Sequence, residues 1–358
     1  MKRPKKSAKA RRYKLTTTIV TALVIFLVVF IFSRSPSLSE WYIQNIYPTV
    51  ATILSTVAGL FPFSLYDLFI LFASLYLLNL VIFALIKRTA FKDLLFSIIR
   101  FIAILVAWFY FGWGISYFRE DYYKRTDTVE TQFNRDNLLN FTSRFIEDAN
   151  NSYVRFDVIE KKEIKKELER VYSELYEPLA IKYPNGNRRD KNMIFESLFT
   201  KMGISGYYGP FFNEIHVNNY SLNYTYPFTL AHEMAHQFGI AKESEANLYA
   251  FLVCANSNDK RIRYSAYIST IGYLLNDAYT LLPEKYKELI NSVRPEIKED
   301  LNRNREHWLS ARNEALSDAQ NKAYDAYLKS NRVSSGRENY SEVVGLLISS
   351  YYNFTKSF

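Results

Sequence analysis

Residues 229–239 of this 358-residue chain read Thr-Leu-Ala-His-Glu-Met-Ala-His-Gln-Phe-Gly, and this stretch decides how the rest of the chain is interpreted. Helix-forming residues run through it, and Pro227 stands at a favourable helix start. On a helix, residues four apart share a face, so His232 and His236 would direct both imidazoles at one point. Glu233 lies beside the first histidine and can reach a water polarised by a metal there. This pattern indicates a Zn²⁺ site with a glutamate that moves protons during hydrolysis.

The residues that follow offer candidates for a third ligand. Gly239 can end the first helix in a left-handed cap, after which the chain can reverse within a few residues. A second helix would begin near Glu243, whose carboxylate could reach the metal from the first turn. Asn247 lies four residues further on the same face, where its amide could orient a ligand through a hydrogen bond. Glu245 is the competing ligand, since a helix boundary read from sequence shifts easily by a residue or two.

This arrangement resembles the gluzincin metallopeptidases, in which a Glu-x-x-x-Asp on the next helix supplies a metal ligand and its hydrogen-bond partner. The likeness covers residues 231–250. It departs from the gluzincin pattern in two ways, because Asn247 replaces the acid and only six residues separate the second histidine from Glu243. The short spacing is closer to that of the metzincins. Lys242 stands where the third ligand of that class would be, so we reject that subclass.

Over most of its length the chain is similar to a bacterial membrane family called domain of unknown function 3810. The similarity rests on Tyr47-Pro48 with Pro62-Phe63-Ser64, on residues 202–208 and on residues 232–247. The resemblance implies a zincin-like fold. Because the family is bacterial, the resemblance also implies that the protein lies in the inner (cytoplasmic) membrane.

Three uncharged stretches are long enough to cross a bilayer, namely residues 15–33, 68–86 and 101–118. The first follows a tail, residues 1–14, that has eight basic side chains and no acidic ones. Its apolar run is long and is followed by a poor cleavage sequence. We therefore interpret it as an uncleaved anchor rather than a signal peptide.

Residues 41–66 are also uncharged, but Pro48 and Pro62 limit the central run to 13 residues. Such a short run is typical of an interfacial or re-entrant segment. With three spans, the basic tail and the loop after Lys87 both lie in the cytoplasm, as the positive-inside rule predicts. A fourth span would place that loop outside. Residues 119–358 would then form one domain on the extracytoplasmic side.

The expected fold is a multi-pass α-helical membrane section followed by a mainly α (α+β) zincin-like soluble domain. Helical apolar patterns cover residues 136–149 and 160–176, and a long charged helix is expected from about residue 295 to 329. Residues 214–218 alternate polar and apolar side chains, as a short half-buried strand does. The aromatic residues of the stretch 108–118 are interpreted as a belt where the chain leaves the membrane.

Glu214, His216 and Asn218 share one face of that strand. One interpretation is a solvated strand face. The other is an edge strand that pairs with an extended peptide substrate and brings His216 near the metal. The candidates for stabilising a developing oxyanion are four tyrosines: Tyr207, Tyr208, Tyr264 and Tyr267.

Charge and cysteine content narrow the class of protein. The formal net charge is +9, and the eight basic side chains of the tail account for most of it, so no nucleic-acid surface is expected. Cys254 is the only cysteine in the sequence, which excludes an intramolecular disulfide and a cysteine-rich zinc site.

The sequence thus predicts a membrane-anchored zinc-dependent metallopeptidase. Its Zn²⁺ would be held by His232, His236 and Glu243, and Glu233 would act as general base. The expected partners are the lipid bilayer and a peptide or protein substrate. The alternative is a metal-binding membrane scaffold or envelope protein without proteolytic turnover.

Overall fold

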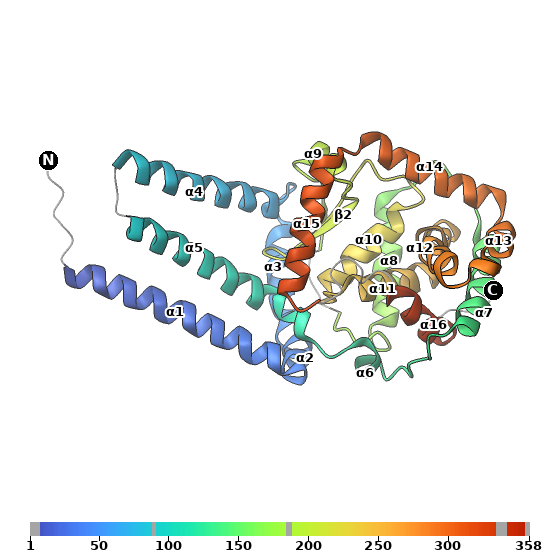
Figure 1. Ribbon diagram of the computed structural model, residues 1–358, viewed down its shortest axis with the longest axis horizontal. Helices are drawn as coiled ribbons and strands as arrows, with labels where there is room; N and C mark the ends of the chain where they lie inside the picture. The colour runs from blue at the N-terminus through green and yellow to red at the C-terminus, as the bar shows by residue number, and fades with distance from the viewer. Residues whose placement is uncertain (1–7, 88–90, 184–187, 334–341, 355–358) are drawn as a thin grey trace.

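The computed structural model describes residues 8–87, 91–183, 188–333 and 342–354. Three long helices lie beside one another at one end of the molecule, and the remaining elements form a globular part at the other end (Figure 1). The long helices are α1 (Ala8–Arg34), α4 (Leu65–Lys87) and α5 (Phe91–Gly112). Residues 1–7 of the basic tail and residues 88–90 of the loop after Lys87 lie outside the described part.

Within the described residues, three helices are long and apolar enough to cross a membrane: Thr16–Arg34, Leu65–Lys87 and Phe91–Gly112. The first two agree closely with the predicted spans 15–33 and 68–86. The membrane association of the chain is therefore supported by helix length and composition.

The third predicted span, 101–118, is wrong at both ends. The prediction began the span after Arg100, because a charge inside a bilayer is costly. In the structure Arg100 lies within α5, and its Nη2 donates a hydrogen bond to Thr18 Oγ1 of α1 at 3.0 Å. That bond gives the guanidinium a polar partner between two apolar helices.

At its other end, α5 ends at Gly112, and the chain then forms the short 3₁₀-helix η1 (Gly114–Phe118). A side chain at Gly114 would lie 2.4 Å from the ring of Phe109, so glycine permits this tight turn. The expected aromatic belt is only partly present. Trp108 is exposed, whereas Trp113 and the aromatic residues of η1 are buried in the core of the globular part.

The predicted interfacial or re-entrant segment, residues 41–66, contains the second half of α2 (Pro36–Asn45), all of α3 (Tyr47–Gly59) and the first two residues of α4. Both short helices lie where the long helices meet the globular part (Figure 1). Tyr42, Tyr47 and Ala51 belong to the same hydrophobic core as the metal motif. The globular part therefore includes α2 and α3, and its predicted start at residue 119 is too late.

The globular part is mainly helical, and the predicted helices 136–149 and 160–176 are α7 and α8. The predicted helix 295–329 is interrupted at Asn313, whose Oδ1 accepts a hydrogen bond from Leu316 N at 3.1 Å and so caps a new helix. The helices are α6 (Tyr122–Thr126), α7 (Arg135–Ser152), α8 (Lys161–Leu175), α9 (Glu196–Met202), α10 (Tyr226–Gln237), α11 (Glu243–Ala255), α12 (Lys260–Leu281), α13 (Pro283–Ser292), α14 (Pro295–Ala311), α15 (Glu314–Ser330) and α16 (Glu342–Phe354).

The described residues contain one three-stranded sheet with the order β1–β3–β2. β3 (Glu214–Val217) pairs antiparallel with β2 (Gly206–Gly209) and parallel with β1 (Asp190–Lys191). A strand is thus present where residues 214–218 predicted one, but it ends at Val217. It is not an edge strand, because strands flank it on both sides, and it is not half-buried, because all four of its residues are buried.

Helix α11 runs through the centre of the globular part, and every one of its residues is buried. A helix that is covered on all sides has no solvated face on which polar side chains can lie. The polar residues at its start, from Glu243 to Asn247, must therefore find partners inside the protein. Those partners are the basis of the site described below.

A buried ion pair ties the sheet to the turn between α3 and α4. Lys191 Nζ donates to the carbonyl of Ala58 at 2.8 Å, near the C-terminal end of α3. Glu214 accepts a hydrogen bond from Tyr66 N at 2.8 Å, at the start of α4. The two side chains are 3.8 Å apart. A cation at a helix C-terminus and an anion at a helix N-terminus each complement the helix dipole.

The turn between β2 and β3 lies against α4 and α5. The ring of Phe211 is 4.7 Å from that of Phe69 in α4. Trp108 Nε1 of α5 donates a hydrogen bond to the carbonyl of Phe211 at 2.9 Å. This hairpin therefore connects the long helices directly to the sheet beside the metal motif.

Candidate metal centre

Helix α10 carries the motif, and α11 follows it after a short reversal. Gly239 has φ +84°, the left-handed conformation expected of a helix C-cap, and Ile240 N donates to the carbonyl of Ala235 at 3.1 Å. A side chain at Gly239 would also approach the ring of Tyr47 to 3.1 Å. The reversal lets the first residue of α11, Glu243, face the histidines of α10.

The structure brings His232, His236 and Glu243 together. The two histidine Nε2 atoms are 3.0 Å apart. Glu243 Oε2 is 3.1 Å from His232 Nε2, and its Oε1 is 3.6 Å from His236 Nε2. One potential ligand atom from each residue lies within 4.8 Å of the other two, as binding of a single ion requires.

The histidines are oriented by hydrogen bonds at their other ring nitrogens. His232 Nδ1 is 3.0 Å from Asn247 Oδ1, and His236 Nδ1 is 2.7 Å from the carbonyl of Ile240. Both partners are acceptors, so each Nδ1 carries the proton and each Nε2 presents a lone pair. Two bare Nε2 lone pairs at 3.0 Å repel one another unless a proton or a metal cation lies between them. The donor set of two imidazoles and a carboxylate fits Zn²⁺.

The protonation states of His236 and Glu243 suit a metal ligand set, whereas the raised pKa of His232 favours its imidazolium, whose Nε2 proton an ion would have to displace. Burial lowers the pKa of His236 to about 4, so its imidazole is neutral at pH 7. Burial would raise the pKa of Glu243, but the neighbouring histidines and Tyr324 lower it to about 2. Glu243 is thus a carboxylate at neutral pH. Burial would lower the pKa of His232, but the hydrogen bond and the charge of Glu243 raise that pKa above its ordinary value.

Glu233 lies next to the three ligands and makes no ion pair with them among the described residues. It is buried, and burial raises the pKa of its carboxyl to about 8. Its Oε2 atom has no hydrogen-bond partner within the described part of the chain. Its Oε1 atom faces Gly206 of β2, where a side-chain Cβ would come within 2.7 Å. An unpaired buried carboxyl oxygen beside a metal site is available to a water or a substrate.

Glu245, the alternative ligand, points away from this group. Its Oε2 is 2.6 Å from Arg125 Nη2, and both side chains are buried. Its Oε1 is 3.5 Å from Lys242 Nζ. Of the two carboxylates at the start of α11, Glu243 is the one that meets the histidines.

We call His232, His236 and Glu243 the metal group. It is not reached by the side chains of β3 and its end: Glu214, His216 and Asn218. His216 Nε2 is 2.8 Å from Ser64 Oγ, and Asn218 Nδ2 donates to the carbonyl of Ile204 at 2.9 Å. These side chains fix the α3–α4 turn and the loop before β2, and neither of the two interpretations made from the sequence describes them. The strand beside the site is β2, whose outer edge has no neighbouring strand within the described residues.

The four candidate tyrosines direct their hydroxyls elsewhere, to Asp67, Asn213, Asp300 and Tyr351 respectively. The tyrosine that contacts the site is Tyr324 of α15, which donates a hydrogen bond to Glu243 Oε1. Sequence reasoning missed it because it lies 81 residues after its partner, in a charged helix without a motif.

Three side chains bind the carbonyls at the end of α10, and sequence reasoning missed them as well. Trp113 Nε1 donates to the carbonyl of His236 at 2.8 Å, and Tyr47 OH donates to that of Gln237 at 2.7 Å. Arg119 Nη1 donates to the carbonyl of Gly239 at 3.0 Å. All three follow or precede a candidate span closely, so the membrane section helps to hold the motif in place.

Residues 42–348 match the family described as "Protein of unknown function (DUF3810)". The chain belongs to this family. The DUF3810 match begins in α2 and ends in α16, so it contains two candidate spans and the whole metal group. No curated protein and no solved structure matches the chain.

Proposed function

We propose that this DUF3810 protein is a membrane-anchored zinc metallopeptidase that hydrolyses peptide bonds. The observation that carries the proposal is the convergence of His232, His236 and Glu243 beside the buried carboxyl of Glu233. Three protein ligands leave a position open on a tetrahedral ion, which is the arrangement of a catalytic rather than a structural zinc site. A structural site has no use for a free carboxyl next to that position.

The chemistry divides between the ion and the protein. Zn²⁺ held by the two histidines and Glu243 would supply Lewis-acid activation of a water and of the scissile carbonyl. Glu233 would accept a proton from the attacking water in its ionised form and deliver it to the leaving amine; because burial raises its pKa to about 8, the accepting form increases as the pH rises through that value. Asn247 and the carbonyl of Ile240 keep the imidazoles in the tautomer that presents Nε2. Tyr324 holds the carboxylate of Glu243.

The strand β2 supplies a place for the substrate. No strand of the described residues pairs with its outer edge, its first two residues are half-buried, and the first of them, Gly206, lies against Glu233. An extended peptide that adds to this edge gains backbone hydrogen bonds and passes beside the catalytic carboxyl. We assign the globular part to the extracytoplasmic side of the bacterial inner membrane, because the basic tail and the loop after Lys87 then lie in the cytoplasm.

The test uses the full chain purified in detergent micelles. We expect one zinc per chain, and we expect cleavage products from a broad peptide library that disappear after chelation and return with zinc. The His232→Ala variant should lose both the metal and the cleavage. Stoichiometric zinc without any cleavage would instead identify a metal-binding membrane scaffold and would overturn the proposal.

A further inference from the structure

Helix α3 is buried on one face and has uncharged, partly apolar side chains on the opposite face. One face, which includes Tyr47, Ala51 and Ala58, is buried in the globular part. On the other face Ile53 and Val57 are exposed. A surface helix in water normally has a polar outer face, whereas α3 has no charged residue at all. Thr49 and Thr56 are also exposed there, so the outer face is uncharged, with Ile53 and Val57 as its apolar part.

The exposed apolar surface continues beyond α3 into the start of α4. Leu60 is 72% exposed, and Phe61 and Phe63 are exposed as well. These residues lead directly into Leu65, the first residue of a candidate span. The surface thus begins at the level where the chain enters the membrane.

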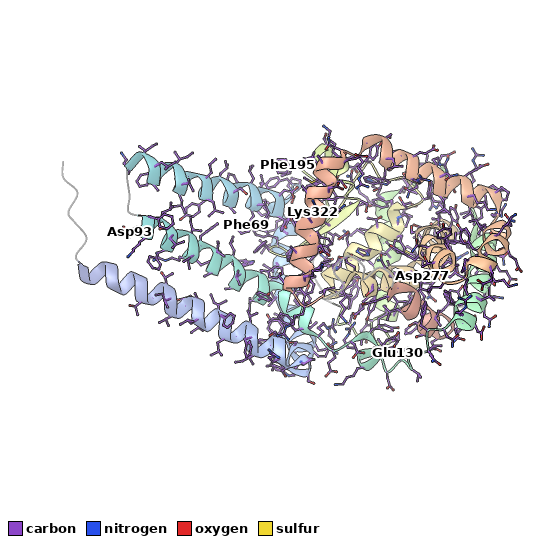
Figure 2. The ribbon with its side chains drawn as sticks, in the orientation of Figure 1. Phe69, Asp93, Glu130, Phe195, Asp277 and Lys322 are labelled. Atoms are coloured by element: carbon purple, nitrogen blue, oxygen red, sulfur yellow. The ribbon has the colours of Figure 1, made fainter. Side chains whose placement is uncertain are left out.

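A second segment extends this surface from the other side. Ile194 N donates a hydrogen bond to Asp67 Oδ2 at 2.8 Å, which places the start of α9 beside the first turn of α4. Ile194, Phe195 and Leu198 are all exposed there. Figure 2 shows Phe195 on the side of the globular part that faces the long helices, and Asp277 farther from them.

We define the apolar rim as these exposed side chains on α3, the α3–α4 turn and the start of α9: Ile53, Val57, Leu60, Phe61, Phe63, Ile194, Phe195 and Leu198. None of its members is charged. The neighbouring Lys191 and Asp67 are buried and bonded to backbone groups, so they present no charge at this surface.

We propose that the apolar rim inserts into the interfacial layer of the bilayer leaflet at which α4 and α5 meet the globular part. The occupant is lipid, because the rim is continuous with a candidate span and any other partner would also have to lie within the membrane. The globular part is then seated on the lipid surface rather than held above it on a flexible tether. Insertion of apolar side chains at this depth is how interfacial helices bind membranes.

The chain offers a direct test through its single cysteine, Cys254, which is buried. In a Cys254→Ala background, Leu60→Cys and Phe195→Cys are labelled with an environment-sensitive fluorophore in the full chain and reconstituted into phosphatidylcholine vesicles. The matched control is Tyr279→Cys, another large side chain that is 65% exposed, on α12. Circular dichroism and zinc content confirm that each labelled variant is folded.

We expect nitroxide lipids to quench the rim probes several-fold more than the control probe, and aqueous iodide to show the reverse order. A nitroxide near the headgroup should quench the rim probes more than one near the end of the acyl chain. Iodide quenching of the rim probes equal to that of the control would overturn the proposal. Protection from both iodide and nitroxide lipid would also overturn it, because a protein partner would then cover the rim.

Discussion

At the scale of single residues, the metal group depends on a few partners that fix side chains within a buried space. His232 and His236 each donate from Nδ1 to an acceptor, and Glu243 is held by Tyr324. Of the four residues at the site, Glu233 is the one with a buried carboxyl oxygen that has no hydrogen-bond partner within the described residues. The division between held ligands and a free acid or base leads to two predictions.

The first prediction concerns Glu233→Gln, which preserves the size of the side chain and removes its proton-transfer capacity. We expect zinc content to stay at one per chain, because the three ligands remain in place. Turnover should fall by about 10²–10⁴-fold, the typical contribution of general acid–base catalysis. Elemental analysis and peptide cleavage measure the two effects. The control Glu196→Gln should change neither, and equal cleavage by both variants would contradict the mechanism.

The second prediction concerns Asn247, which accepts the Nδ1 proton of His232. Asn247→Ala removes this acceptor, so we expect zinc affinity to fall by about 10–100-fold. Asn247→Asp keeps an acceptor oxygen at the same position and should retain the affinity. Competition with a chromogenic chelator measures both variants. If alanine and aspartate weakened binding equally, the hydrogen bond would not be what orients the imidazole.

At the scale of elements, the sequence predicted those features whose interacting residues lie close together in the chain. The helix, glycine cap and second helix of residues 226–255 could be anticipated because the ligands are at most eleven positions apart. The third span was misplaced because the partner of Arg100 lies 82 residues away in α1. Tyr324 and Arg125 separate the roles of Glu243 and Glu245, and they lie 81 and 120 residues from their respective partners. Such long-range pairs have no local pattern.

A third prediction follows from the close approach of β2 to α10. A Cβ at Gly206 would lie 2.7 Å from Glu233 Oε1 and 2.9 Å from Thr229 Cγ2. We expect Gly206→Ala to displace Glu233 and to lower kcat more than it lowers zinc content, with a loss of about 1–3 kcal/mol in stability from overpacking. Gly272→Ala is the control, since nothing lies within 4 Å of its Cβ position in α12.

Alanine is favoured over glycine within a helix by about 1 kcal/mol, so the Gly272 control should be as stable as the parent or more so. Thermal unfolding and single-turnover cleavage compare the two variants. A Gly206→Ala protein with unchanged turnover would show that β2 does not constrain the catalytic carboxyl.

At the scale of the whole molecule, the membrane section and the globular part are joined by buried contacts rather than by a linker. Lys191 and Glu214 of the sheet bind the backbone at the end of α3 and the start of α4. Trp113, directly after α5, binds the carbonyl of His236. The two parts should therefore unfold together.

The fourth prediction tests this connection. Lys191→Met leaves the buried carboxylate of Glu214 without its cation, so we expect a loss of about 3–5 kcal/mol in the free energy of unfolding. The double variant Lys191→Met/Glu214→Gln should lose less than the single variant, because no unpaired charge remains. Denaturant unfolding in micelles measures both. Arg135→Ala breaks an exposed pair with Glu284 and should cost less than about 1 kcal/mol.

The hairpin of β2 and β3 links the candidate spans to the site of the proposed reaction. Its turn lies against α4 and α5 at Phe211, and Gly206 at the other end of β2 meets Glu233. A strand rises about 3.3 Å per residue, so β2 spans about 10–13 Å between its turn beside α4 and α5 and the carboxyl of Glu233. In the proposed peptidase, a membrane-tethered polypeptide would need a stalk of about four extended residues to cover the same length. The length of β2 would then limit which tethered substrates can reach Glu233.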